Sequence, residues 1–282
     1  RIRRFAGPEC FLEHLEGLRV AHLTDLHVGR VTPMAVQYDA VAMTNAGEPD
    51  IVVITGDFVC HSQVYLDDLT EVISKIDAPV FATLGNHDHW AGAESVRRAL
   101  KRGGAEILDN AHTVVEIGHQ RLQVLGLDDA YTGHADRREA IKGLRSDLPV
   151  IGLSHIGEEA DGLWDADVPL VFSGHTHAGQ ITVARLHELS VGKLAGHKYV
   201  HGLYGSRGSE DPKGAVYVGI YGDRLYGGTV GTSVHDVLSA AGVVDLAASA
   251  GYTGSPAYSN EQLLSLDPPW IITNEPGEDA LC

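Results

Sequence analysis

Five short runs of polar residues, each placed directly after an apolar stretch, constrain what this 282-residue chain can fold into. Apolar stretches rich in β-branched residues are typical of buried strands, and open α/β sheets place their ligands just beyond the carboxyl ends of strands. We therefore expect the five loops to converge on one site. The runs are Asp25-Leu26-His27, Gly56-Asp57, Gly85-Asn86-His87-Asp88, Ser154-His155 and Gly174-His175-Thr176-His177.

The side chains in these runs have the chemistry of metal ligands. Two carboxylates, one amide oxygen and at least four imidazoles exceed what one ion needs and suit two. Asp57, at a tight Gly-Asp turn, is the natural candidate to bridge both ions. Asp25 and His27 can reach a single ion, whereas His175 and His177 can diverge, one to each. The sequence predicts two divalent ions, and mixed oxygen and nitrogen ligation leaves Mn, Fe, Zn, Co and Ni open.

The apolar stretches alternate with helical patterns over the first half of the chain. Strands are expected at 18–24, 51–55 and 79–84, and helices at about 33–45, 64–76 and 93–102. An antiparallel hairpin is expected over 112–127, then a polar helix near 136–146, and further strands at 149–153, 168–172 and 181–183. This pattern indicates an α/β fold with helices outside the sheet, and the hairpin is consistent with two packed sheets.

Net charge restricts the partners. The formal charge is −17, from 21 Lys+Arg and 38 Asp+Glu, and no basic cluster is longer than Arg1-Ile2-Arg3-Arg4. We expect no nucleic-acid binding through a basic face. Bound cations would offset the negative charge locally, so that an anionic substrate could still approach.

The sequence leaves the cellular compartment open. It contains no apolar run long enough to span a bilayer and no signal peptide, but it begins without Met, so membrane association through a missing N-terminal segment stays open. Cytoplasmic, inner-membrane-peripheral and exported forms are all compatible with it. The three cysteines, Cys10, Cys60 and Cys282, suggest neither a disulfide framework nor a thiolate zinc site. Oligomeric state is not predicted.

The order of the five motifs resembles that of the calcineurin-like metallophosphoesterases over residues 18–205, with an extension to about 219 left open. Three of the motifs are similar in sequence to those of the bacterial YkuE/YaeI-like branch: Thr24-Asp25-Leu26-His27, Thr55-Gly56-Asp57 and the run from Gly174 to Gln180. The resemblance implies a four-layer αββα sandwich of two mixed β-sheets flanked by helices, with the site at one edge. One departure is Gly157, because the family often has Pro two residues after the lone histidine, here His155.

The resemblance also implies a role for each motif residue. It assigns Asp25, His27 and His177 to the first metal, Asn86, His155 and His175 to the second, and Asp57 to both. His87 matches a histidine that is not a ligand but contacts the phosphate and is the candidate proton donor to the leaving oxygen. Asp88 could orient that imidazole. Asn86 is also a substrate-binding candidate, and His61 and His89 are weaker ones.

The function expected from these residues is hydrolysis of a phosphate monoester or diester by a dinuclear metal-dependent phosphoesterase. A metal-bridging hydroxide would attack phosphorus, without a covalent enzyme intermediate. The substrate would be a small phosphate ester, and nucleotide-linked and lipid-linked forms are both open.

The last seventy residues carry a different pattern, after a polar stretch at 205–214. Residues 214–282 read as a small α/β segment, and the domains are expected at 1–205 and 214–282. The runs 231–238, 241–248, 258–268 and 270–272 resemble part of the C-terminal lobe of periplasmic binding proteins for iron-siderophores and cobalamin. The alternative function is therefore a non-enzymatic binding protein that uses this segment. An appended structural segment, or an artificial or accidental fusion, is the other interpretation.

Overall fold

The computed structural model describes residues 7, 9–30, 32–177, 182–183, 186–190, 197–199, 214–221, 224–240, 244–259, 262, 266 and 270–273. The chain divides into two compact units, residues 1–204 and 205–282. Each unit is described by itself. Several predicted features lie wholly or largely outside the described residues: the basic N-terminus, the polar stretch at 205–214 and the end of the fifth motif at Gly179 and Gln180.

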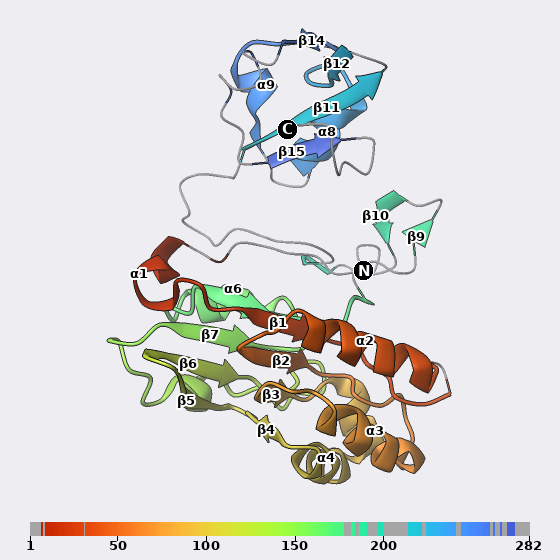
Figure 1. The fold of residues 1–282 in the computed structure, drawn as a ribbon, viewed down its shortest axis with the longest axis vertical. Coiled ribbons are helices and arrows are strands. Elements are labelled where there is room, and N and C mark those ends of the chain that lie inside the picture. The colour runs from red at the N-terminus through yellow and green to blue at the C-terminus, as the bar shows by residue number, and fades with distance from the viewer. Residues whose placement is uncertain are drawn as a thin grey trace. The chain divides into compact units, whose positions relative to one another are not determined.

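Two four-stranded sheets form the first unit (Figure 1). The first sheet is parallel in the order β1 (Val20–Leu23), β2 (Ile51–Thr55), β3 (Val80–Thr83) and β4 (Ala105–Ile107). The second sheet pairs β5 (Ala111–Ile117) antiparallel with β6 (Gln120–Gly126), and then adds β7 (Val150–Leu153) and β8 (Leu170–Phe172) in parallel. A short pair, β9 (Thr182–Val183) and β10 (Leu186–Ser190), follows.

Helices connect the strands of each sheet. The connections of the first sheet contain α2 (Met34–Ala46), the 3-10 turn η2 (Gln63–Tyr65), α3 (Leu66–Ser74) and α4 (Asn86–Arg102). Those of the second contain α5 (Arg137–Ile141) and α6 (Glu159–Trp164). The short η1 (Glu9–Phe11) and α1 (Leu12–Leu15) precede β1. Among the described residues, no helix is long and apolar enough to cross a membrane.

Three separate apolar clusters define a four-layer sandwich. One lies between the first sheet and its helices and contains Val52, Ile54 and Leu69. The second lies between the two sheets and contains Ile51, Val53, Leu122 and Ile151. The third lies between the second sheet and its helices and contains Leu125, Ala140 and Leu163. The predicted arrangement of two helix-flanked sheets is therefore confirmed.

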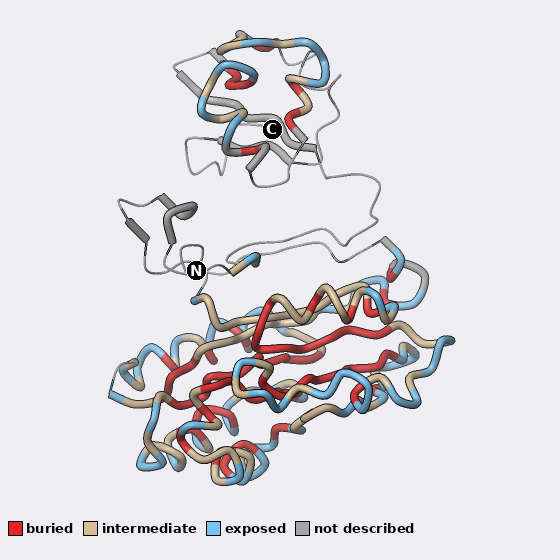
Figure 2. The backbone as a smooth tube through the Cα atoms, turned by 180° about the vertical axis from the view of Figure 1, so that it is seen from behind, coloured by how far each residue is buried: buried red, intermediate tan, exposed pale blue. Residues whose placement is uncertain are grey.

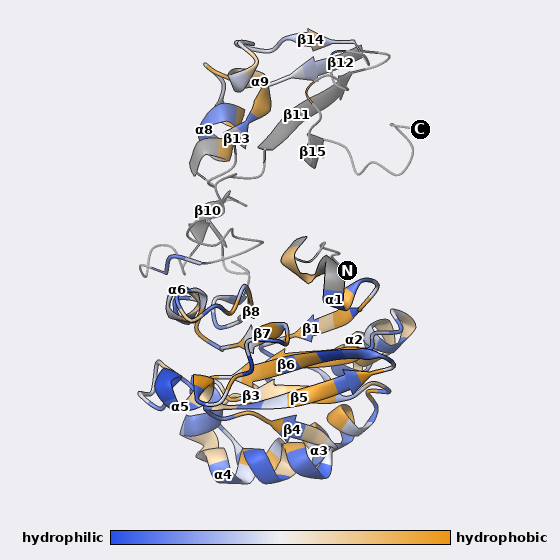
Figure 3. Cartoon of the chain, turned by 90° about the vertical axis from the view of Figure 1, so that its left-hand side faces the viewer, coloured by the Kyte–Doolittle hydropathy of each residue, from blue (hydrophilic) through white to orange (hydrophobic). Residues whose placement is uncertain are grey.

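Strand β2 explains how the layers are held together. Its side chains alternate, with Val52 and Ile54 in the helix-side cluster and Ile51 and Val53 in the cluster between the sheets. All five of its residues are buried, as expected for a strand covered on both faces. In Figure 2 the buried residues lie mainly along the strands of the two sheets. Figure 3 shows that these strands are largely hydrophobic and that α3 and α4 carry hydrophilic residues.

Local predictions differ from the structure mainly at element ends. Helix α4 begins at Asn86, not near residue 93, because Gly92 (φ 109°) interrupts the helical backbone and hides the first turns from a periodicity argument. The third motif therefore lies on the first turn of a helix and not in a loop. Strand β4 and helix α6 were not predicted, and α5 is shorter than the expected helix at 136–146.

In the second unit, β11 (Gly214–Tyr221) pairs with β12 (Arg224–Gly227), β13 (Val244–Asp245) and β15 (Trp270–Thr273), and β12 pairs with β14 (Ala257–Tyr258). Helices α8 (Ser233–Ala240) and α9 (Leu246–Ser249) accompany this sheet. The expected α/β character of this segment is therefore present in the described residues. Ser259 and Gln262 form the two reciprocal hydrogen bonds of a capping box, because the N–H of Ser259 donates to Gln262 Oε1 and the N–H of Gln262 donates to Ser259 Oγ.

Candidate metal centre

The five motifs follow strands of both sheets. Asp25, Asp57 and Asn86 come after β1, β2 and β3 of the first sheet. His155 follows β7, and His175 and His177 follow β8 of the second sheet. The carboxyl ends of parallel strands lie at the same edge of a sheet, which brings these side chains together.

One group of ligand atoms comes from Asp25, His27, Asp57 and His177, whose candidate atoms all lie within 4.8 Å of one another. The Nε2 atoms of His27 and His177 are 3.1 Å apart, and His177 Nε2 is 3.4 Å from Asp25 Oδ1. Asp25 Oδ1 is buried and has no hydrogen-bond partner in the described part of the chain. A buried carboxylate oxygen without a donor, facing two imidazole nitrogens, fits a divalent cation.

A second group joins Asp57 to His155, His175 and Asn86. His155 Nε2 lies 3.3 Å from Asp57 Oδ2, and His175 Nδ1 lies 3.3 Å from His155 Nε2 and 3.1 Å from Asn86 Oδ1. His155 Nδ1 is 2.7 Å from the carbonyl of Thr55. A carbonyl only accepts, so Nδ1 carries the hydrogen and Nε2 is left to bind a metal.

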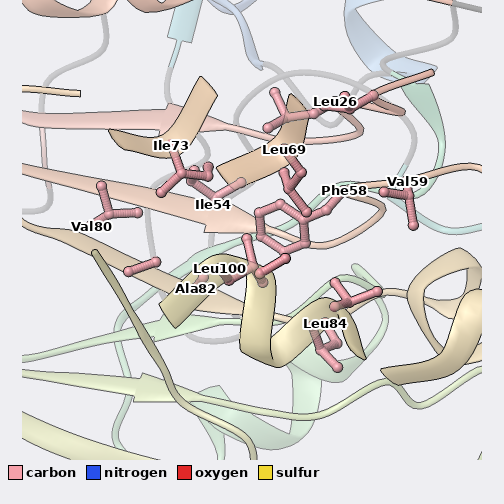
Figure 4. Close-up of a cluster of buried hydrophobic side chains, with 14 of the residues drawn as sticks. Leu26, Ile54, Phe58, Val59, Leu69, Ile73, Val80, Ala82, Leu84 and Leu100 are labelled. Carbon is pink, nitrogen blue, oxygen red and sulfur yellow. The ribbon is translucent and has the colours of Figure 1, made fainter. Parts of the chain in front are cut away.

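Asp57 belongs to both groups. Its Oδ2 is 3.7 Å from His27 Nε2 and 3.3 Å from His155 Nε2, while its Oδ1 accepts the backbone N–H of His87 at 2.9 Å. The next residue, Phe58, is fully buried among Ile54, Leu69 and Leu100 (Figure 4). The apolar core therefore fixes the loop that carries this carboxylate.

The backbone is strained at these positions. Five motif residues have positive φ: Asp25 (53°), His27 (44°), Asp57 (55°), His175 (69°) and His177 (51°). Positive φ is uncommon outside glycine, and strained residues cluster at functional sites. Gly85 and Gly174 permit the close approach of the loops, because a Cβ at Gly85 would collide with Asp57 and one at Gly174 with Thr24 and Asp25.

Burial and charge act against each other at the Asp57–His155 pair. Burial alone would lower the pKa of His155, but its hydrogen bond to Asp57 and the charge of that carboxylate raise the pKa to about 9. Burial would raise the pKa of Asp57, and the His155 bond and charge instead lower it to about 2. Because an imidazole must be neutral to bind a metal, an ion that binds at Nε2 of His155 competes with a proton there.

His87 lies beside this centre with one ring nitrogen fixed. Its Nδ1 is 2.7 Å from the carbonyl of Cys60, to which it donates, and its Nε2 is 3.9 Å from Asp57 Oδ2. Its ring centroid is 4.9 Å from that of His27 and 4.5 Å from that of His61. Because Nδ1 carries the hydrogen, Nε2 is the ring nitrogen on the side of Asp57.

The expectation that Asp88 orients His87 is wrong. Asp88 is fully buried, and its Oδ1 accepts the N–H groups of Phe58 (2.9 Å) and Val59 (3.2 Å) while its Oδ2 accepts that of Gly85 (2.9 Å). At the first turn of α4 its carboxylate points back to these amides, so the carbonyl of Cys60 orients His87 instead. Burial raises the pKa of Asp88 to about 7, and the charge of Asp57 adds to that shift.

His61 and His89, the two weaker substrate-binding candidates, are placed differently. His61 lies against His87 and Trp90, whereas His89 Nε2 is 2.6 Å from Asp128 Oδ1 and its ring stacks on His134. His89 therefore has an ion-pair partner in Asp128, and its contact with substrate stays a prediction. Three neighbours of the centre were not predicted: Trp90, Tyr131 and His197. No sequence motif marks them, and only the ring contacts reveal them.

Comparison with known proteins identifies this arrangement. Residues 18–179 match the model of the calcineurin-like phosphoesterase family. The chain belongs to this family. The match covers the five motifs as far as Gly179 and so includes every residue of the two groups. The predicted metal-dependent phosphoric ester hydrolase class is confirmed at the level of the family.

Three relatives illustrate the range of the family. The phosphodiesterase YaeI of Escherichia coli is 29% identical over 223 residues, covering 76% of this chain and 80% of YaeI. A Danio rerio transmembrane protein with a metallophosphoesterase domain is 34% identical over 185 residues, covering 60% of this chain and 42% of that protein. The UDP-2,3-diacylglucosamine pyrophosphatase LpxG of Chlamydia muridarum is 27% identical over 218 residues, covering 60% and 66%. The chain thus spans less than two thirds of the last two.

The family match ends before the second unit. The expected resemblance of residues 214–282 to a periplasmic binding-protein lobe gains no support from these relatives and stays a prediction.

Proposed function

We propose that this chain is a dinuclear metal-dependent phosphodiesterase. Asp25, His27 and His177 would hold one ion, Asn86, His155 and His175 the other, and Asp57 would join them. The relatives YaeI and LpxG, named for a phosphodiester and a pyrophosphate substrate, favour a diester over a monoester.

One observation supports two ions in particular: Oδ2 of Asp57 lies within 3.7 Å of ring nitrogens from both groups. A single carboxylate oxygen in this position can be shared. The remaining donors then divide into two sets. One set has the carboxylate of Asp25 and two imidazoles, and the other has the amide of Asn86 and two imidazoles. Mixed sets of this kind accept several first-row ions, so availability would decide the metal.

When bound, the two ions supply positive charge to the phosphoryl oxygens and lower the pKa of the water that attacks phosphorus. The chain itself supplies the remaining steps. The imidazolium of His87, held through Nδ1 by the Cys60 carbonyl, contacts the phosphate through Nε2 and donates its proton to the leaving oxygen. Asp88 acts only as a positioning residue, because it ties the Asp57 loop to the turn at Gly85.

Metal analysis and hydrolysis together test this proposal. The purified chain should bind close to two divalent ions and hydrolyse bis(p-nitrophenyl) phosphate. Asp57→Asn should lower metal content and abolish turnover, because the shared ligand loses its charge. His87→Ala should lower turnover about 10²- to 10⁴-fold, as expected for loss of an acid catalyst, and keep the metal.

Asp67→Asn is a matched control, because it makes the same chemical change at a carboxylate that is 91% exposed on α3. It should alter neither metal content nor turnover. Less than one ion per chain, together with no hydrolysis of aryl phosphate esters after metal addition, would disprove the proposal. Loss of metal in His87→Ala would make His87 a ligand and refute its assigned role.

A further inference from the structure

Two large aromatic side chains remain exposed beside the metal centre. Trp90 is 52% exposed and Tyr131 is 61% exposed, although both are large rings that a fold ordinarily covers. The centroid of Trp90 lies 5.0 Å from that of His87, and the centroid of Tyr131 lies 5.6 Å from that of His175. The two rings are themselves 6.0 Å apart and nearly perpendicular, at 81°.

The loop that carries Tyr131, between β6 and α5, is held by side chains. Asn110 Oδ1 accepts the N–H groups of Asp128 (3.1 Å) and Asp136 (2.8 Å), and so ties the two ends of the loop together. Inside the loop, Asp129 Oδ2 accepts the N–H of Thr132 at 2.7 Å. A loop with this many internal partners presents Tyr131 in a defined position.

The helix that carries Trp90 is joined to the same loop. His89, its neighbour on α4, lies 2.6 Å from Asp128, and its ring stacks on His134 with centroids 4.0 Å apart. The ring of His61 lies 5.8 Å from that of Trp90 at an angle of 26°. These contacts hold the two segments that carry the aromatic rings before any ligand is present, which lowers the entropic cost of binding a ligand.

We propose that Trp90 and Tyr131 form an aromatic subsite for a planar ring on the phosphate ester, such as a nucleobase, which would stack on one of the two rings and meet the other edge to face. This inference rests on the proposed function and names its substrate class. Both rings adjoin residues of the catalytic centre, His87 and His175, so a ligand whose phosphate lies at the metals can place a ring against them. Aromatic side chains stack on any base through its π-face, which makes such a subsite selective for planar rings and not for one base.

Inhibition by a matched pair of monophosphates tests the subsite. AMP and ribose 5-phosphate share the sugar and phosphate and differ in the base. Each is titrated against hydrolysis of methyl p-nitrophenyl phosphate by the metal-loaded full chain, and each affinity is checked by calorimetry. Stacking on one aromatic side chain strengthens binding by about 5- to 150-fold, so AMP should inhibit at least about fivefold more strongly than ribose 5-phosphate.

The variants locate that difference. Trp90→Ala and Tyr131→Ala should each reduce the AMP preference to about threefold or less while leaving inhibition by ribose 5-phosphate unchanged. Trp90→Phe should keep most of the AMP preference. Tyr38→Ala, which removes a ring that contacts Glu71 of α3 and the following Lys75, should leave the AMP preference unchanged.

Equal inhibition by AMP and ribose 5-phosphate in the unmodified chain would overturn the subsite, and so would an AMP preference that survives both alanine variants. A third contrary result would be that hexyl phosphate inhibits more strongly than methyl phosphate by a factor as large as the AMP preference, and that Trp90→Ala abolishes this difference. The last would show that the rings receive an alkyl chain. If methyl p-nitrophenyl phosphate is not hydrolysed but calorimetry still gives the AMP preference, the proposed function fails and the subsite stands.

Discussion

Replacing Asp88 by Asn separates a positioning residue from a catalytic one. The carboxylate accepts three buried backbone N–H groups, from Phe58, Val59 and Gly85. The amide oxygen of Asn can still accept from Phe58 and Val59, but its NH₂ group would face the N–H of Gly85, donor against donor. Leaving a buried backbone donor unpaired costs about 1–3 kcal/mol, and here the new NH₂ donor also faces the unpaired N–H of Gly85. We therefore expect Asp88→Asn to lower the free energy of unfolding by about 2–3 kcal/mol.

Thermal and urea unfolding with metal analysis measure this effect. A loss of about 2–3 kcal/mol lowers the Tm of a unit this size by roughly 5–10 °C. Metal affinity should fall as well, because the Gly85 turn and the Asp57 loop are no longer tied together. In the variant, the pH dependence of the residual turnover should keep the shape it has in the unmodified chain. If Asp88→Asn retains full stability and metal but changes that pH dependence, Asp88 acts on His87 and our reading of its contacts is wrong.

The remaining predictions concern ion pairing, metal and glycine. The pKa of His89 is raised in the folded chain, because the hydrogen bond to Asp128 outweighs the effect of burial. The stability that this ion pair contributes is therefore complete below the unfolded pKa of His89, about 6.5, and is lost as pH rises through the higher folded pKa. Urea unfolding should therefore show that His89→Gln destabilises the chain more at pH 5.5 than at pH 9, and the opposite order would refute this. Removing metal with a chelator should lower Tm, and excess Mn²⁺ or Zn²⁺ should restore it, because ions that bind only the folded state stabilise it; an unchanged Tm would contradict a bound metal. Gly174→Ala should abolish metal binding, because its Cβ would collide with Thr24 and Asp25, whereas Gly143→Ala, where nothing lies within 4 Å, tests backbone strain alone and should keep the metal.

The layered core could be predicted because its pattern is local. In β2, five consecutive apolar or β-branched residues are buried on both faces, and their alternation sends Val52 and Ile54 one way and Ile51 and Val53 the other. The motif residues were equally predictable, because each follows a strand and topology brings strand ends together. Sequence pattern alone therefore predicted which residues meet.

The partners of individual side chains were not predictable in the same way. Asp88 follows His87 in the sequence, yet the start of α4 turns its carboxylate toward the amides of Phe58 and Val59. Trp90 and Tyr131 stand in ordinary polar surroundings in the sequence, and long-range contacts such as the bond between His89 and Asp128 bring their segments together. Such contacts depend on helix phase and loop closure, which no spacing rule encodes.

The backbone explains why the first two motifs have the residues they do. Beyond the strand ends, the pairing of β1 with β2 continues through hydrogen bonds from Asp25 to Gly56 (3.1 Å) and from His27 to Asp57 (2.9 Å). Between Asp25 and His27, Leu26 enters the helix-side apolar cluster, which leaves both ligands on the side of the metal centre. The turn requires positive φ at Asp25, His27 and Asp57, a conformation that Asp and His tolerate better than β-branched residues do. The motif therefore meets two requirements at once, because the same side chains that could hold a metal ion are also compatible with the strained backbone that brings them together.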